Sequence, residues 1–207
     1  AAIARFTADP TIANLQYLFD PDYALDPEDL RKVILSLAVR GKLVRQEEGD
    51  GSAKVYRKKI QSPPWAIPDN WAWVGLSDVC ITITYGEHLT PDYSHEGVPM
   101  LSAKHIGNKE IIWSDFKHVS VNLAKKCWLR CRPAVGDILV VSRGGGVGRS
   151  ILSDRSNYCL MGSVLLFKTN NNVESMYVNY FLNSEYGNRK LRTTSGTSAQ
   201  QAIYIAH

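Results

Sequence analysis

The stretch AVGDILVVSRGGGVGRSIL, residues 134–152, joins two strand-like segments through a glycine-rich turn. Residues 138–141 are apolar with branched side chains, which is typical of a buried strand, and residues 149–152 are suited to a second strand. The glycines between them permit backbone conformations that other residues rarely adopt. We therefore expect two strands joined by a tight turn, inside a unit that is rich in β-structure.

The sequence on either side of this turn continues the β pattern. Short apolar runs bounded by turn residues predict further strands at residues 79–84, 98–101, 111–113 and 164–168. Residues 176–191 carry aromatic side chains at helical spacing and predict a helix. The expected fold class is α+β: a curved, mostly antiparallel sheet with flanking helices, preceded by a small helical appendage.

The appendage is predicted from the region around residues 26–41. Asp26-Pro27-Glu28-Asp29 offers a capping aspartate, a proline in the first turn and acidic side chains near the positive end of the helix dipole. Gly41 is a natural residue to end this helix. Between these ends one apolar stripe recurs at helical spacing, formed by Leu30, Val33, Ile34, Leu37 and Ala38.

A change of composition marks a domain boundary. Residues 46–62 are polar and charged, and Pro63, Pro64 and Pro68 then interrupt the chain. The sequence therefore divides into an N-terminal helical segment with its linker, residues 1–62, and a second domain, residues 63–207.

The net charge and the cysteines indicate which kind of partner and which cellular compartment to expect. The 207-residue chain has a formal net charge of +4, which suits a polyanionic partner without requiring one. No apolar run approaches the roughly 20 residues that span a bilayer, and the first residues lack a signal-peptide pattern, so we expect no membrane partner. The four cysteines lie in apolar surroundings, which favours buried free thiols in a reducing cytoplasm. Basic residues cluster within residues 31–59, 125–132, 143–155 and 189–192.

Two motifs suggest enzymes but lack the necessary context. The glycine run has no Gly-Lys-Ser/Thr, and a strand rather than a helix is expected after it, which disfavours nucleotide binding. The tetrapeptide Ser62-Pro63-Pro64-Trp65 is similar to the catalytic motif of DNA amino-methyltransferases. The residues before it are basic and polar rather than a buried strand, and no methyl-donor motif lies upstream. We interpret it as part of the linker.

Metal-dependent chemistry has little support either. No carboxylate cluster typical of a magnesium-dependent nuclease is evident. Cys127 and Cys131, with His118 nearby, lack the ligand spacing of a zinc site. We therefore expect no catalytic residue, no metal and no cofactor in this chain.

Five segments, taken in order, resemble the specificity subunits of type I restriction-modification systems. The most specific is residues 134–152, quoted above. The others are LRKVILSLAVRGKLVRQ (residues 30–46), PPWAIPDNWAWVGLSDV (residues 63–79), ITITYGEHLTPDYSHEGVPMLSAKHIGNKEI (residues 81–111) and TSGTSAQQAIY (residues 194–204). The resemblance departs from the usual family pattern in one respect, because the family carries two recognition domains and only one is present here.

The resemblance implies a function in DNA recognition. It implies that residues 63–207 form a target recognition domain for duplex DNA and that the chain itself has no catalytic activity. Separate modification subunits would methylate adenine with S-adenosylmethionine, and a restriction subunit would cleave with ATP, so those cofactors belong to the partners. The alternative is a DNA-modifying enzyme fragment, either a methyltransferase or a nuclease.

On this interpretation the glycine turn is either a simple connection between strands or a loop held against DNA. In the second case Arg143 is expected to contact a base edge and Arg149 a phosphate. The apolar stripe of Val33, Ile34 and Leu37 either binds the modification subunits or packs on the recognition domain. The residues expected to contact DNA are Thr84, Tyr85, Gly86, Lys104, His105, Arg143, Gly144, Arg149, Arg192, Ser195, Thr197 and Gln200.

Overall fold

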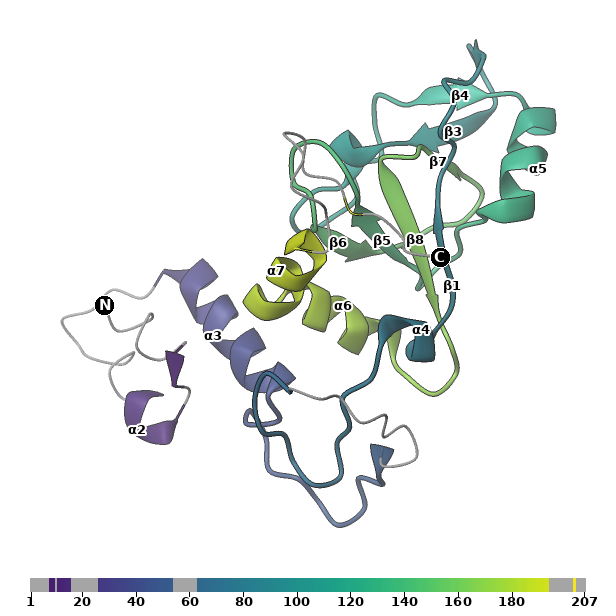
Figure 1. Cartoon of the computed structure of the whole chain (residues 1–207). Coiled ribbons are helices and arrows are strands. Elements are labelled where there is room, and N and C mark those ends of the chain that lie inside the picture. Colours follow the sequence, from purple (N-terminus) through teal and green to yellow (C-terminus); the bar gives the residue numbers. More distant parts are fainter. Residues whose placement is uncertain (1–7, 10, 16–25, 54–62, 194–202, 204–207) are drawn as a thin grey trace. The chain divides into compact units, whose positions relative to one another are not determined.

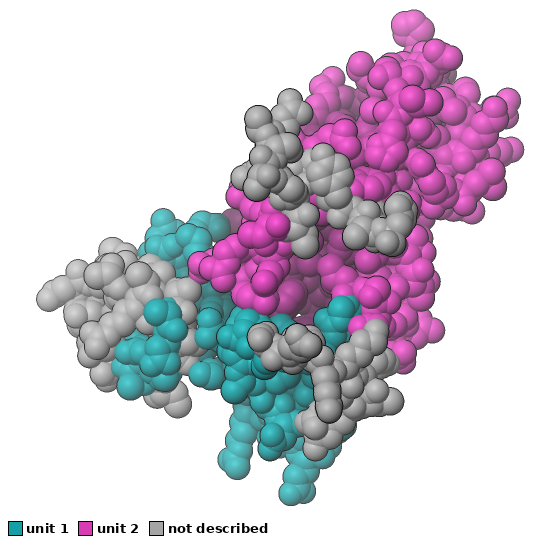
Figure 2. All heavy atoms as spheres, in the orientation of Figure 1, with its two compact units in different colours: residues 1–75 teal, residues 76–207 magenta. Residues whose placement is uncertain are grey.

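The structure is a computed structural model that describes residues 8–9, 11–15, 26–53, 63–193 and 203. The chain divides into two compact units, residues 1–75 and residues 76–207 (Figure 2). This division is based on how compactly the residues pack. The predicted boundary between the functional domains, between residues 62 and 63, stays a prediction. Among the described residues no helix is long and apolar enough to cross a membrane.

The described part of the first unit includes the helices α2 (Ile12–Leu15) and α3 (Pro27–Val39). The predicted cap of α3 is confirmed, because the Asp26 carboxylate accepts a hydrogen bond from the Glu28 backbone N–H at 2.7 Å. Gly41 follows the helix with a φ of +66°. The Lys42 N–H then donates to the Leu37 carbonyl at 2.9 Å and closes the last turn.

An aromatic cluster packs beside the end of α3, within the first unit. The Arg40 guanidinium lies 4.8 Å from the centre of the Trp65 ring, and Trp65 meets Trp73 edge-on with ring centres 4.8 Å apart. The Trp71 indole N–H donates to the Gln46 side-chain oxygen at 2.8 Å. Residues 40–46 and 65–73 therefore form one packed piece, although the polar linker separates them in sequence.

Two four-stranded sheets form the centre of the second unit (Figure 1). The larger sheet is antiparallel throughout, in the order β1 (Cys80–Tyr85), β8 (Val164–Thr169), β5 (Ile138–Val141) and β6 (Ser150–Leu152). The smaller sheet has the order β2 (Tyr93–Ser94), β4 (Lys117–Val119), β3 (Val98–Leu101) and β7 (Cys159–Leu160), with only β3 and β7 parallel. The predicted α+β class is confirmed.

The larger sheet is covered on both faces at its central strand β5, where all four residues are buried. Leu139 and Val141 point into one core with Leu166, and Ile138 and Val140 point into the other with Phe167. The second core also receives apolar side chains from the two C-terminal helices, α6 (Ser175–Asn183) and α7 (Glu185–Thr193). The other helices among the described residues of this unit are α4 (Leu76–Val79), the 3₁₀ turn η3 (Ala103–His105) and α5 (Val121–Arg130).

Two expectations about secondary structure are wrong. Residues 111–113 form no strand, and Ile111 makes only an isolated bridge to Ile106. The single helix expected over residues 176–191 is two helices that meet at Ser184. The Ser184 hydroxyl donates to the Phe181 carbonyl at 2.6 Å and accepts from the Gly187 N–H at 3.1 Å, so one side chain satisfies both helix ends.

The cysteines are free thiols, and Cys127, Cys131 and Cys159 are buried. Burial raises the pKa of Cys131 and of Cys159 to about 12, against an ordinary value of 9.0. The unfolded chain therefore ionises these thiols at lower pH than the folded chain does. The contribution of these buried thiols to the free energy of unfolding is therefore fully present below pH 9, and it is expected to decrease as the pH rises toward 12.

Denaturant titrations from pH 7 to 11 test this expectation. The Cys131→Val variant removes one of the two thiols at similar volume and is expected to show a weaker decline at alkaline pH. An identical decline in the variant and the wild type would assign the effect to other groups.

Candidate nucleic-acid interface

Antiparallel pairing brings candidate residues from distant parts of the sequence to one end of the larger sheet. Tyr85 at the end of β1 and Val141 at the end of β5 both pair with the start of β8. Beyond the strands, the Gly86 N–H donates to the Val164 carbonyl at 3.1 Å. Tyr85, Gly86 and Arg143 therefore lie at the same end of the sheet.

Residues 142–149 form the predicted tight turn between β5 and β6, here called the glycine loop. Gly144, Gly146 and Gly148 have φ values of +92°, +90° and +84°, in the left-handed region that favours glycine. The Gly148 N–H donates to the Val141 carbonyl and the Arg149 N–H to the Gly146 carbonyl, both at 2.9 Å. The loop is therefore an ordered turn with its own hydrogen bonds.

Helix α7 fixes the base of the glycine loop. The Asn188 amide donates to the Gly148 carbonyl at 2.8 Å, and the Arg192 Nε donates to the Val147 carbonyl at 3.0 Å. A Cβ on Gly148 would lie 2.9 Å from the Asn188 amide nitrogen, so the helix packs closely against the loop. Arg192 thus has a structural bond in addition to its expected role on DNA.

Arg149 connects the glycine loop to the turn that follows β3. Its Nη1 donates to the Ile106 carbonyl at 2.8 Å, and its guanidinium lies against Gly146, where a Cβ would be only 3.0 Å away. The side chain is half-buried. Its contact with a phosphate stays a prediction, and the structure gives this arginine a positioning role within the loop.

Arg143 differs from Arg149 because it lies at the open tip of the loop. It is exposed, and among the described residues its guanidinium has no hydrogen-bond or ion-pair partner. Within residues 63–193, nothing lies within 4 Å of where a Cβ would stand on Gly144 or Gly145. A ligand can therefore approach the backbone closely beside a free guanidinium.

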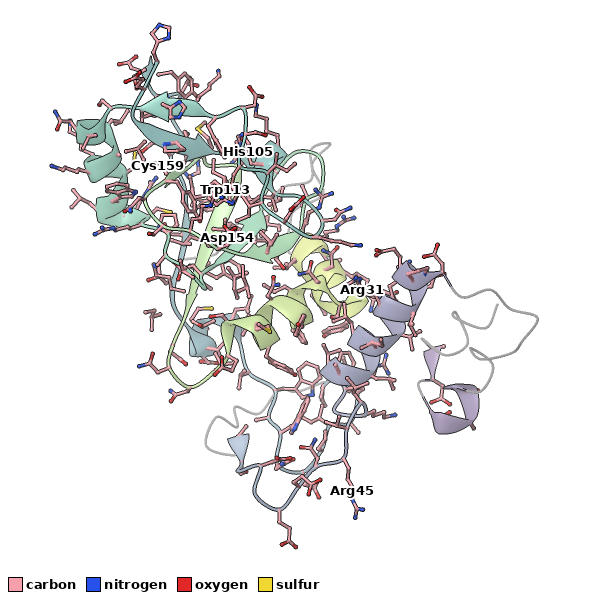
Figure 3. The ribbon with its side chains drawn as sticks, turned by 180° about the vertical axis from the view of Figure 1, so that it is seen from behind. Arg31, Arg45, His105, Trp113, Asp154 and Cys159 are labelled. Carbon is pink, nitrogen blue, oxygen red and sulfur yellow. The ribbon has the colours of Figure 1, made fainter. Side chains whose placement is uncertain are left out.

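Lys104 and His105 occupy η3, next to the carbonyl that Arg149 binds. Lys104 is exposed and its Nζ lies 2.5 Å from the Asp115 carboxylate. His105, labelled in Figure 3, is buried. Its Nδ1 accepts from the Ser102 N–H at 2.9 Å, and its ring is stacked 4.4 Å from that of Phe116. Burial lowers the pKa of His105, which favours the neutral imidazole. The histidine shapes the turn from inside, so this geometry does not favour it as a DNA contact.

The other expected contacts at the sheet end are less exposed. Thr84 is half-buried within β1, and Gly86 is buried. A Cβ on Gly86 would lie 2.2 Å from the Leu160 carbonyl oxygen, so this glycine is needed for packing. The Tyr85 hydroxyl donates to the Ile203 carbonyl at 2.8 Å. Ser195, Thr197 and Gln200 lie outside the described residues.

The structure adds two basic residues that the sequence prediction left out of the site. Arg189 and Lys190 are exposed on α7, the helix that holds the loop, and each lies within 6 Å of the Tyr186 ring, at 5.9 and 5.8 Å. The signal in the sequence was the run Arg189-Lys190-Leu191-Arg192, which places Leu191 in the core and the charged residues around it. We call the following set the glycine-loop surface: Arg143, Gly144, Gly145, Arg189, Lys190 and Arg192.

The expected partner-binding stripe lies on α3 in the first unit. Val33 is buried, Leu37 is half-buried and Ile34 is 43% exposed. The stripe therefore has one buried member and one member that is open to a partner, and its binding role stays a prediction.

Comparison with known proteins supports the fold assignment. No protein-family model matches the chain, and no curated protein matches it. A chain solved in work on complex assembly and conformational transition of the type I restriction-modification system is similar with a TM-score of 0.52 and 18% identity. This match covers 86% of the present chain and 39% of the solved one.

Two further solved chains are similar over part of their length. The HsdS subunit from Thermoanaerobacter tengcongensis has a TM-score of 0.48 and 19% identity, over 62% of this chain and 30% of that one. The type I restriction-modification S subunit from M. genitalium has a TM-score of 0.41 and 14% identity, over 70% and 34%. The present chain thus spans about a third of the length of the solved chains it matches.

The fold defines a class of protein, an α+β domain with two mostly antiparallel sheets and flanking helices. Within that class, the chain is similar to chains of type I restriction-modification systems, and the match with a TM-score of 0.52 indicates a shared fold. The resemblance seen in the sequence motifs is therefore confirmed at the level of the fold.

Proposed function

We propose that this chain recognises duplex DNA sequence-specifically, as the specificity subunit of a cytoplasmic type I restriction-modification complex. It would direct partner subunits that methylate and cleave. The observation that carries the proposal is Arg143, an exposed arginine at the tip of a loop whose base is fixed, with no side-chain partner in the part of the chain that the structure describes. The fold shared with a chain of such a system supports the same function.

The geometry of the glycine-loop surface suits a nucleic acid for three reasons. An arginine can donate two hydrogen bonds to the O6 and N7 atoms of guanine, the commonest specific contact in the major groove. Exposed glycines let the backbone approach phosphates, and the cations on α7 add charge. A rigid support keeps the arginine in place, because α7 and η3 both hold the loop.

Salt dependence provides the first test. Neutralising about five phosphates should give a slope of roughly −4 to −5 for the logarithm of the binding constant against the logarithm of salt concentration. The measurement is a fluorescence titration of a labelled duplex with the whole chain at several salt concentrations. A flat response would show that the basic residues do not face DNA.

We expect the chain alone neither to methylate nor to cut DNA. The alternative of a methyltransferase or nuclease fragment is not favoured, because the sequence shows neither a methyl-donor motif nor the carboxylate cluster of a magnesium-dependent nuclease. Transfer of a labelled methyl group from S-adenosylmethionine to DNA by the pure chain would support the alternative. So would magnesium-dependent cleavage.

The stripe on α3 is proposed to bind the modification subunit, and Ile34 is the position to test because it is 43% exposed. The Ile34→Asp variant is expected to weaken co-purification with the modification subunit several-fold while leaving thermal unfolding unchanged. An aspartate at this position would place an unpaired charge in an apolar contact. A lower melting temperature with normal co-purification would instead assign the stripe to internal packing.

A further inference from the structure

A second basic surface lies in the second unit, away from the glycine loop in sequence. Residues 116–136 contain five lysines and arginines and no aspartate or glutamate. The whole chain has 24 basic and 20 acidic residues, so the rest of the chain is close to neutral. We call this set the β4–α5 surface: Lys117, Lys125, Lys126, Arg130 and Arg132.

The local structure turns most of these charges outward, whereas the Arg130 guanidinium lies 3.9 Å from the Glu87 carboxylate. Ala124 and Cys127 are the buried residues of α5 and pack in a core with Val119 of β4. Lys125, Lys126 and Arg130 are exposed on the helix, which lies beside the smaller sheet (Figure 1). Among the described residues Lys125 and Lys126 have no ion-pair partner. These two cations are therefore available to an anion from outside.

Aromatic rings hold two other cations of the set. The Lys117 ammonium lies 4.4 Å from the centre of the Tyr93 ring, and the Arg132 guanidinium 5.3 Å from that of Trp128. A cation held over a ring loses part of its conformational freedom before any ligand binds. The positive charge of this surface is thus partly fixed in space.

The β4–α5 surface reaches the same end of the larger sheet as the glycine loop. The Arg130 Nη2 donates to the Gly86 carbonyl at 2.8 Å, and the Gly86 N–H donates to Val164 at the start of β8. The next residue toward the N-terminus, Ser163, accepts the N–H of Ser142, which precedes Arg143. A short chain of hydrogen bonds therefore links α5 to the glycine loop.

We propose that the β4–α5 surface is a second contact for the DNA phosphate backbone, which lengthens the footprint without reading bases; this rests on the proposed function. Lysines bind phosphates as flexible point charges, and such contacts carry little sequence information. Base reading would remain with the glycine-loop surface. The partner chemistry is the sugar-phosphate backbone of duplex DNA.

The test replaces two unpaired lysines in the whole chain. The double variant Lys125→Gln/Lys126→Gln keeps helix propensity, because lysine and glutamine are similar helix formers. Its salt slope on a duplex of about 30 base pairs should be smaller than that of the wild type by roughly 1.8, since each phosphate contributes about 0.9. The loss of affinity should be the same on two duplexes of unrelated sequence, and circular dichroism should match the wild type.

A matched control separates local contact from net charge. Arg31→Gln/Lys32→Gln removes the same charge from α3, where Lys32 lies 2.8 Å from Asp29 and Arg31 lies 3.9 Å from Glu28. This control should keep the wild-type slope on DNA. An equal reduction in both double variants would overturn the proposal, because it would reflect net charge alone.

The remaining outcomes distinguish this inference from the proposed function. If the wild type binds DNA and Arg143→Ala weakens it, but the α5 variant keeps its slope, then only the second contact surface is overturned. If the wild type binds no duplex at any salt concentration, both fail together.

Discussion

The Leu166→Ala variant is expected to lose about 2–5 kcal/mol of unfolding free energy, because it leaves a cavity in the centre of the fold. Leu166 is fully buried on β8, which lies between β1 and β5. It pairs with Thr84 on one side and Leu139 on the other. A folded domain has only about 5–15 kcal/mol in total, so this single change removes a large fraction of it. Denaturant titration followed by circular dichroism measures the loss.

The matched control is Leu129→Ala, which makes the same chemical change on the surface of α5. Leu129 is 90% exposed, so its truncation should change stability by less than about 0.5 kcal/mol. Similar losses in the two variants would contradict the placement of β8 at the centre of the fold. The Leu166→Ala variant should lose DNA binding at the same denaturant concentration at which it unfolds, since the ends of β1, β5 and β8 carry the candidate interface.

The parts of the fold that the sequence predicted are those that local pattern decides. Residues 98–101 and 138–141 form β3 and β5 with the predicted bounds. Residues 138–141 are apolar without interruption because β5 is covered on both of its faces. The Asp26 cap is also local, since its bond reaches only to Glu28.

Helix α5 was not predicted, because its apolar stripe is short and built partly of small residues, Ala124 and Cys127. The missed signal was Ser120, whose hydroxyl accepts from the Leu123 N–H at 3.2 Å as an N-terminal cap. The break at Ser184 was missed for a different reason. Aromatic spacing continued across it, and the hydroxyl that stabilises the break was not distinguishable from a surface serine.

The candidate site was predicted as a set of residue types, but its internal roles depend on long-range contacts. Arg149 binds Ile106 and Arg192 binds Val147, at sequence separations of 43 and 45 residues. No local pattern reveals such partners. From the sequence both Arg143 and Arg149 are expected to contact DNA, at a base edge and at a phosphate, and the structure shows that they differ in exposure and in hydrogen bonding.

The Arg143→Ala variant is expected to lose about 1–3 kcal/mol of binding free energy on the target duplex and much less on a scrambled one. The reason is that Arg143 is exposed at the loop tip and, among the described residues, its guanidinium has no partner, so we expect it to contact a base edge. The target is obtained by sequencing methylated adenines in cells that express the complete system. Binding titrations at several salt concentrations then compare the two duplexes, and thermal unfolding of the variant should match the wild type.

The Arg149→Ala variant is the control for Arg143→Ala. It removes the same residue type at the other end of the loop, where the side chain has a different role. Removing its guanidinium leaves the Ile106 carbonyl without this donor and frees the loop from η3. The expected loss is about 1 kcal/mol of unfolding free energy, with weaker binding to target and scrambled duplexes alike. Equal and sequence-independent losses in both variants would mean that Arg143 contacts only phosphate. Wild-type affinity for both duplexes in Arg143→Ala would remove the loop tip from the DNA interface, and the specificity would then have to come from another part of the sheet end.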